Sequence, residues 1–184
     1  APVTVAGRSG ETLVTTDEAP GRIKIEKIST LKPAFAKDGT VTAASSSSIS
    51  DGAAALVLMR AETATKLGSK PIARIVAHAT HSHQPEWFTT APIGAAQKVL
   101  AKAGWSKEDV DLWEVNEAFA VVPMAFMQEL GVSHEVLNVN GGACALGHPV
   151  GTTGARLMAT LIYALQARGK KRGLAALCIG GGEA

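Results

Sequence analysis

The sequence predicts an α/β fold built from parallel βαβ units, and three observations support this. β-like and helical segments alternate along residues 40–178, which is typical of such units. Glycine follows the last apolar-periodic residue of four predicted helices, as it does at many helix ends: Gly68, Gly104, Gly131 and Gly169. The stretch 152–165 has Arg156 as its one charged residue. We therefore expect a helix there that is buried between layers, with a sheet on each side.

The individual elements follow from local signals. Residues 1–32 contain short β-like pieces at 2–5, 12–15 and 22–28, separated by glycine and proline, and predict an extended arm. Residues 33–184 form the second unit. Pro123 is tolerated only in a first helical turn, so the helix around it should begin near Ala120. The predicted strands are 40–43, 72–77, 111–115, 136–139 and 173–178, and the predicted helices are 51–67, 93–103, 120–130 and 151–168.

Composition narrows the class of protein. The 184 residues are 46% hydrophobic and 18% charged, and no apolar run is long enough to span a membrane. The net charge is +2, and the basic cluster of residues 168–172 predicts a helix C-terminus rather than a nucleic-acid site. With two cysteines and no signal peptide, we expect reduced thiols and a cytoplasmic location. The chain starts without methionine, and we expect it to be part of a longer protein.

Three predicted strands are each followed by a loop of polar or glycine-rich residues, and these three loops should converge. They are residues 116–119 (Asn-Glu-Ala-Phe), residues 140–149 and residues 178–182 (Cys-Ile-Gly-Gly-Gly). In parallel sheets the carboxyl ends of the strands form the ligand crevice, so all three loops should lie on one rim. The sequence therefore predicts a single site at this rim.

His148 and Cys178 are the candidates for proton chemistry at this rim. His148 precedes Pro149 at the start of the apolar helix, where the helix dipole favours a neutral ring that donates to an oxyanion. The alternative is a histidine that is merely hydrogen-bonded within a loop. Cys178 ends an apolar strand and meets three glycines, which suits proton transfer, although a structural cysteine is the ordinary case. Cys144 lies between two alanines and is interpreted as a small packed residue.

A metal site is the other hypothesis that the sequence raises. His81 and His83 are close in sequence, but the nearest carboxylate is Glu86 and no cysteine lies at ligand spacing. We expect no metal.

The three loops, in this order and spacing, resemble the catalytic loops in the C-terminal half of thiolases, especially of the acetyl-CoA C-acetyltransferase type. The resemblance runs from about residue 12 to 183. It implies a thiolase-like fold, in which this chain forms one βαβαβαββ half, with a mixed sheet flanked by helices and a truncated final strand. It also implies that Cys178 moves the α-proton of acetyl-CoA. His148 and a water held by Asn116 would form the oxyanion hole for the enolate, and His148 would also help to activate the nucleophile. The N–H of Gly180 would contribute to a second oxyanion hole, for the tetrahedral intermediate.

The same resemblance implies coenzyme A thioesters as substrates, with no further cofactor. Ser45 and Ser48 depart from the family pattern in the segment that contacts pantetheine, and Trp87-Phe88 predicts a preference for short acyl chains. The implied partners are the N-terminal thiolase half, which supplies the acyl-accepting cysteine, and further copies in a homodimer or homotetramer. Without that half we expect no turnover. The implied substrate-binding residues are Ser47, Ala43, Phe35, Ala118, Phe119 and Phe88.

Three alternatives remain open. One is a 3-ketoacyl-CoA thiolase of fatty-acid degradation. The second is a ketoacyl synthase, against which Cys178 argues, since that role is not filled by cysteine there. The third is a thiolase relative that binds coenzyme A or lipid without catalysis. This alternative has no support in the present chain, because all four catalytic positions that the resemblance implies are intact: Asn116, His148, Cys178 and Gly180.

Overall fold

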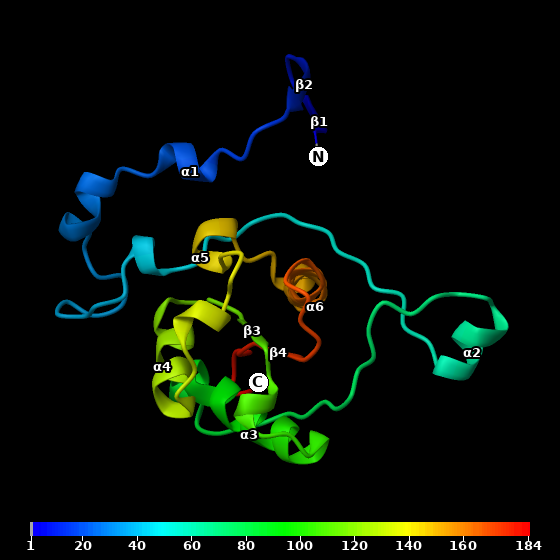
Figure 1. Ribbon diagram of the computed structural model, residues 1–184. Coiled ribbons are helices and arrows are strands. Elements are labelled where there is room, and N and C mark those ends of the chain that lie inside the picture. Colours follow the sequence, from blue (N-terminus) through cyan, green and yellow to red (C-terminus); the bar gives the residue numbers. More distant parts are fainter. Residues whose placement is uncertain (1) are drawn as a thin grey trace.

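The computed structural model describes residues 2–184, and its N-terminal part is an arm that runs along one side of the molecule (Figure 1). Strands β1 (Val3–Gly7) and β2 (Gly10–Val14) form an antiparallel hairpin, close to two of the predicted β-like pieces. The third predicted piece, 22–28, is wrong. Helix α1 (Ala19–Arg22) and the 3₁₀ helix η1 (Ile25–Thr30) occupy this region instead. Pro20 stands in the first turn of α1, where its fixed φ and missing N–H favour a helix start.

Residues 40–80 contain much less regular structure than the sequence predicts. The predicted strand 40–43 is wrong, because residues 40–42 are irregular and Ala43 begins the 3₁₀ helix η2 (Ala43–Ser45). The predicted helix 51–67 is reduced to α2 (Ala61–Lys66). The predicted strand 72–77 is absent from the described chain, which runs there without a ladder partner. Figure 1 shows α2 at the end of a long excursion away from the other helices. Apolar side chains that would need a packing partner stay in solvent, and Val57 is 86% exposed.

The core consists of one parallel pair of strands with helices on both faces. Strands β3 (Leu112–Val115) and β4 (Gly173–Ala176) pair in register from Leu112↔Gly173 to Val115↔Ala176. Helices α3 (Ala91–Ala103) and α4 (Val121–Leu130) cover one face and α6 (Val150–Ala167) the other (Figure 1). The remaining short elements are η3 (Pro85–Thr90), η4 (Lys107–Asp109), η5 (His134–Val136) and α5 (Ala143–Leu146). The predicted α/β class is confirmed.

The alternation of side chains along β3 distributes the core between the two faces. Trp113 and Val115 pack in the larger cluster with Phe126 of α4, and the Trp113 and Phe126 rings meet edge to face with centroids 5.6 Å apart. Leu112 points to the opposite face, against Leu161 of α6. The sheet is therefore the middle layer of three.

Two expectations about this core need correction. Helix α6 packs on one sheet within residues 2–184, not between two, and its far face is exposed at Tyr163. The predicted strand 136–139 is reduced to a single parallel bridge between Leu137 and Trp113. Asn138 has a left-handed φ of 49°, which breaks the extended conformation directly after that bridge.

The predicted helix ends are confirmed. Gly68, Gly104, Gly131 and Gly169 have φ of 63°, 67°, 62° and 63°, the left-handed conformation that only glycine adopts readily. Helix α4 begins at Val121, as the position of Pro123 predicts. None of the helices in the described chain has the length and apolarity needed to cross a membrane.

Candidate active site

The three predicted loops meet at the carboxyl ends of β3 and β4. The N–H of Asn116 donates to the carbonyl of Ala176 at 2.9 Å, which continues the ladder by one step toward Cys178. The middle loop reaches the same rim through Asn138, whose Oδ1 accepts from the N–H of Val115 at 2.7 Å and whose Nδ2 donates to its carbonyl at 2.8 Å. One rim therefore carries the beginnings of all three loops.

Asn116 has no exposed surface, and its side-chain amide makes no hydrogen bond with the residues that the structure describes. A buried amide without a partner is rare because its desolvation costs about 1–3 kcal/mol. An unpartnered donor and acceptor at a strand end are chemically suited to hold water or a substrate oxygen.

Cys178 is 7% exposed and belongs to the larger core cluster. Burial raises the pKa of its thiol, because the thiolate is poorly solvated there. The following loop is fixed by backbone pairing: the N–H of Ile179 donates to the carbonyl of Glu183 at 2.7 Å, and that of His83 donates to Gly182 at 2.9 Å. At Gly180, by contrast, an added Cβ would meet no atom within 4 Å, so this part of the loop borders open space.

His148 is held from both sides. Its N–H donates to the carbonyl of Ser48 at 2.9 Å, and its Nδ1 lies 2.7 Å from Oγ1 of Thr153. Burial, and then the positive charge of Arg156, lower the pKa of the imidazole. The ring is therefore neutral at neutral pH, as the sequence predicts, although burial and Arg156 are its causes here.

Arg156 forms an ion pair with Glu114 of β3, with Nη1 and Oε1 3.0 Å apart. The Glu114 side chain is 1% exposed, and burial raises its pKa to about 7 despite the opposing effect of Arg156. This pair connects α6 to the strand that precedes Asn116.

Sequence reasoning missed Glu117. Its Oε1 accepts from Nδ2 of Asn138 at 3.0 Å, and its Oε2 accepts from the N–H of Cys144 at 3.0 Å. A Cβ at Gly142 would collide with this carboxylate, so a larger residue there would displace the Glu117 side chain from its present position. The signal was present, since a glutamate next to Asn116 accompanies a glycine pair on the neighbouring loop, but nothing in the sequence shows that they touch.

Cys144 is half buried beside this carboxylate. Burial, followed by the negative charge of Glu117, raises the pKa of the Cys144 thiol to about 11. Such a thiol is a poor nucleophile at neutral pH, which agrees with the interpretation of Cys144 as a packed residue.

Most residues of the predicted coenzyme A segment gather next to the loop of residues 116–119. Ser47 donates to the Ala118 carbonyl from its N–H at 3.2 Å and from its hydroxyl at 3.0 Å. The ring of Phe119 lies 5.6 Å from that of Phe35 and 6.4 Å from that of Phe88 in edge-to-face arrangements. Ala43 begins η2, the turn that leads into this serine segment. An exposed aromatic surface thus lies beside the strand ends, with Phe35 75% exposed.

The rings of His81 and His83 are 5.3 Å apart beside a recess of about 370 Å³, which Glu129 also lines. Within residues 2–184, no three histidine, cysteine or acidic side chains are grouped so that they could hold a metal ion.

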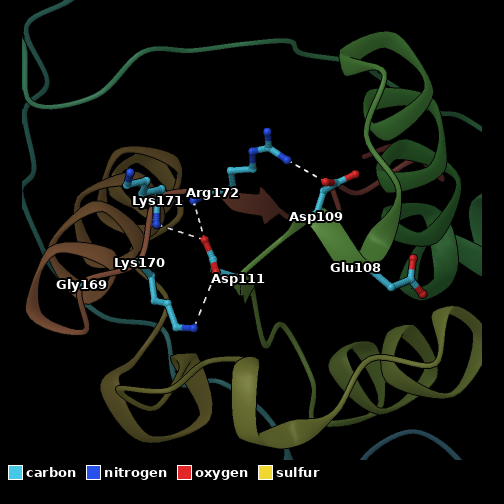
Figure 2. Close-up of a pocket in the computed structure, with 7 residues that line it drawn as sticks. All are labelled: Glu108, Asp109, Asp111, Gly169, Lys170, Lys171 and Arg172. Atoms are coloured by element: carbon cyan, nitrogen blue, oxygen red, sulfur yellow. Dashed lines mark hydrogen bonds and ion pairs between the residues drawn. The ribbon is translucent and has the colours of Figure 1, made fainter.

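A larger recess of about 530 Å³ lies at the opposite ends of β3 and β4, away from the three loops (Figure 2). Asp111 Oδ2 accepts from the N–H groups of Lys171 at 3.0 Å and Arg172 at 2.9 Å. Asp109 pairs with the Arg172 guanidinium at 2.7 Å. These charges are matched within the recess. The basic cluster follows the end of α6, where Arg168 is the C-cap residue, as the sequence predicts. Lys170 and Arg172 pair in addition with Asp111 and Asp109, which precede β3.

Two family models match the chain, and they lie in succession. The model described as thiolase, C-terminal domain, matches residues 69–184, and that described as thiolase, N-terminal domain, matches residues 1–62. The two matches meet between residues 62 and 69, further along the chain than the boundary predicted at residue 32.

Individual relatives agree with these models. A cytosolic acetyl-CoA acetyltransferase of Mus musculus is 49% identical over 184 residues, covering 98% of this chain and 46% of the relative. The crystal structure of the Bacillus anthracis acetyl-CoA acetyltransferase superposes with a TM-score of 0.92 at 46% identity, covering 100% of this chain and 47% of that one.

Two further solved structures extend the comparison. Human mitochondrial 3-ketoacyl-CoA thiolase superposes with a TM-score of 0.86 at 35% identity, covering 100% of this chain and 47% of that one. The Acat5 thiolase of Ascaris suum, solved in complex with coenzyme A, superposes with a TM-score of 0.84 at 40% identity, covering 98% of this chain and 46% of that one. The chain spans about half the length of the relatives it matches. With the C-terminal model matching well over half of its residues, the chain belongs to the thiolase family.

Proposed function

We propose that the full-length protein containing this chain is an acetyl-CoA C-acetyltransferase, which condenses two acetyl-CoA molecules to acetoacetyl-CoA and catalyses the reverse thiolysis. The observation that carries the proposal is the meeting of the Asn116, His148 and Cys178 loops at one end of the β3–β4 pair. The names of the mouse and Bacillus relatives support the same reaction.

In this mechanism Cys178 is the general base of the condensation. Its thiolate takes a proton from the methyl carbon of acetyl-CoA, and the electron pair moves onto the thioester oxygen. The high thiol pKa caused by burial makes the thiolate scarce but strongly basic once formed. The enolate carbon then attacks an acetyl group held as a cysteine thioester. A carbon–carbon bond forms, the carbon–sulfur bond breaks, and that cysteine leaves as a thiolate. We assign this second cysteine to the part of the protein outside the 184 residues.

Stabilisation of the enolate oxygen falls to His148, together with the amide of Asn116, which would hold a water. Donors that are already in place favour the transition state, because negative charge reaches the thioester oxygen only as the proton leaves. The Asn116 amide has no protein partner among residues 2–184, which suits this role. The backbone N–H of Gly180 would stabilise the tetrahedral intermediate of acyl transfer.

Coenzyme A would lie along Ser47 and the aromatic group formed by Phe35, Phe88 and Phe119, with Ala43 and Ala118 at its edge. The Ascaris suum relative in complex with coenzyme A supports this ligand. We propose no metal and no cofactor beyond the thioester substrate. We also propose a homodimer or homotetramer that includes the N-terminal thiolase half, and a cytoplasmic location, which the name of the cytosolic mouse relative supports.

A degradative 3-ketoacyl-CoA thiolase is the second candidate, since a human enzyme of that name shares this fold. Phe88 favours the short-chain enzyme, because it places a bulky ring 6.4 Å from that of Phe119 in the proposed coenzyme A segment. Turnover of acetoacetyl-CoA should exceed that of long-chain 3-ketoacyl-CoA in the full-length protein. Comparable turnover of both would favour the degradative enzyme.

The Cys178→Ala variant of the full-length protein tests the assigned role. It should lose condensation of acetyl-CoA by at least about a hundredfold, a typical effect of removing a general base. It should still become acetylated, because that step uses the other cysteine. Mass spectrometry of the protein after incubation with acetyl-CoA measures the acetyl group. Cys144→Ala is the matched control and should retain condensation, whereas condensation retained in Cys178→Ala would contradict the role.

A further inference from the structure

His83 lies in residues 81–83, which we call the anchoring segment, and it takes no part in the mechanism proposed above. Its side chain and its backbone contact two different parts of the candidate site. Nε2 of the ring is 2.7 Å from the carbonyl oxygen of Trp87 in η3. The backbone N–H donates to the carbonyl of Gly182 at 2.9 Å, in the loop that follows Cys178. One residue thus joins η3 to the loop of the candidate general base.

The chemical nature of the ring contact follows from its acceptor. A carbonyl oxygen can only accept a hydrogen bond, so Nε2 of His83 must carry a hydrogen and donate it to Trp87. The ring of His81 packs edge to face against that of His83, with centroids 5.3 Å apart. The imidazole of His83 is therefore a donor that is held between the anchoring segment and η3.

The backbone of the anchoring segment gives this donor a firm base. The segment pairs antiparallel with residues 182–184, and the backbones of His81 and Ala184 exchange two hydrogen bonds at 2.9 and 2.8 Å. A Cβ at Gly182 would collide with the carbonyl oxygen of His83, so the two backbones are in close contact there. These contacts are made by the main chain and do not depend on the imidazole.

Helix η3 needs such an external bond to keep its position. It is a 3₁₀ helix of six residues, and the hydrogen bonds of 3₁₀ helices are less well aligned than those of α-helices. The hydroxyl of Thr90 also donates to the Trp87 carbonyl, at 2.9 Å, but both residues belong to η3. That bond stiffens η3 without fixing it to a neighbour, whereas the bond from His83 connects η3 to the anchoring segment.

Phe88 directly follows the carbonyl that His83 holds. Its ring packs against the larger core cluster and is 6.4 Å from that of Phe119. Because a peptide unit is planar and rigid, a movement of the Trp87 carbonyl also moves the backbone of Phe88. The place of the Phe88 ring in the candidate site is thus tied to the imidazole of His83.

We propose that His83 is a positioning residue that holds Phe88 in place relative to the Cys178 loop, and that the preference for short acyl chains depends on its bond to Trp87. This inference rests on the proposed function and adds a determinant of selectivity to it. Loss of the imidazole donor lets η3 shift and gives a longer acyl chain room beside Phe88. The main-chain bonds of the anchoring segment keep the Cys178 loop where it is.

Thiolysis by the full-length protein measures this selectivity as the ratio of kcat/KM for acetoacetyl-CoA to kcat/KM for 3-ketohexanoyl-CoA. His83→Leu should lower the ratio about two- to tenfold, the effect of one hydrogen bond, while kcat for acetoacetyl-CoA stays within about twofold of the wild type. A loss of stability alone would lower turnover of both substrates alike and leave the ratio unchanged. His83→Gln, whose amide NH₂ reaches the position of Nε2, should restore the ratio. His134→Leu, on the exposed turn η5, is the control and should have no effect.

A double variant asks whether His83 acts through Phe88. Phe88→Ala should lower the same ratio, and adding His83→Leu to it should lower the ratio no further, because the ring that His83 positions is gone. Additive effects of the two substitutions would contradict the proposal.

Hydrogen–deuterium exchange measures the contact itself and does not rely on turnover. The amide hydrogens of η3 should exchange faster in His83→Leu than in the wild type and at the wild-type rate in His83→Gln, while those of residues 182–184 stay unchanged. Unchanged exchange in η3, or an unchanged selectivity ratio, in His83→Leu would overturn the inference. If His83→Leu does not fold, His83→Asn, whose amide is too short to reach Trp87, takes its place. Absence of wild-type turnover would refute the proposed function and leave the exchange test intact.

Discussion

At the scale of single residues, the carboxylate of Glu117 connects two loops of the candidate site. Each of its oxygens accepts a hydrogen bond, from the Asn138 side chain and from the Cys144 backbone. Asn138 is in turn bonded to the backbone of Val115, directly before Asn116. Glu117 thus connects the loop of Asn116 to the loop that leads to His148, and the relative positions of these two proposed oxyanion residues depend on it.

Glu117→Gln should separate these two loops. A glutamine must turn its NH₂ group toward one of the two N–H donors, so one hydrogen bond is lost and two donors face each other. We expect the free energy of unfolding to fall by about 1–3 kcal/mol and kcat of the full-length protein to fall about tenfold or more. Urea unfolding and steady-state thiolysis measure the two effects. Glu135→Gln, on an exposed turn, is the control and should leave both unchanged. Equal behaviour of the two variants would show that Glu117 does not position the loops.

At the scale of elements, the ion pair between Glu114 of β3 and Arg156 of α6 joins the sheet to the helix that carries His148. Removing charges from water is costly, so a buried ion pair stabilises a protein only weakly, whereas the loss of one partner leaves an unpaired buried charge and is strongly destabilising. Burial outweighs Arg156 in this pair and raises the pKa of Glu114 to about 7. The contact between β3 and α6 is therefore sensitive to pH near neutrality.

The sign of the pH effect follows from this raised pKa. In the unfolded chain Glu114 ionises at its ordinary pKa of 4.5, whereas in the folded protein it keeps its proton up to about pH 7. The stability that protonated Glu114 adds to the folded protein is fully present below about pH 4.5 and is lost as the pH rises through about 7. The free energy of unfolding falls by about 3 kcal/mol at most over this range. Glu114→Gln should remove this part of the pH dependence, and Glu86→Gln, on η3, should not. Urea unfolding from pH 4 to pH 8 compares the variants. A Glu114→Gln profile parallel to that of the wild type would contradict the assignment.

The elements also show which local signals suffice to predict structure. Glycine after a helix and proline in a first turn act through the backbone of neighbouring residues, and the ends at Gly104 and Gly131 and the start of α4 are as predicted. The apolar runs at 51–60 and 72–77 do not form elements in the described chain. An apolar pattern becomes a strand or helix only where another surface covers it.

At the scale of the whole molecule, the chain has a compact part around β3, β4, α3, α4 and α6 and a long exposed part (Figure 1). Large apolar side chains are exposed along that second part, among them Ile25, Ile49, Val57, Leu58 and Ile72. Exposed apolar surface on this scale indicates an interaction surface or a tendency to aggregate. The family members that match are about twice as long as this chain, and we propose that the rest of the protein covers this surface.

The 184 residues expressed alone should therefore show no thiolase turnover and should self-associate. Size-exclusion chromatography with light scattering measures the association, and an assay with acetoacetyl-CoA and coenzyme A measures the activity. The full-length protein is the control and should give a defined oligomer with activity. A monodisperse, active 184-residue chain would refute both expectations.

The sequence by itself determined the α/β class, the helix ends and the three loops that meet at one rim, because these depend on backbone preferences and on the geometry shared by all parallel strands. It also marked Asn116, His148 and Cys178 through motifs that are local in the chain. The tertiary structure decided the contacts of Glu117, the hydroxyl of Thr153 beside His148 and the pairing of Glu114 with Arg156. Glu117 and Glu114 find their partners 21 to 42 residues away. Thr153 is only five residues from His148, but its contact depends on how the loop enters α6. No local pattern encodes such meetings, because they arise only when packing brings the loops, the strand and the helix together.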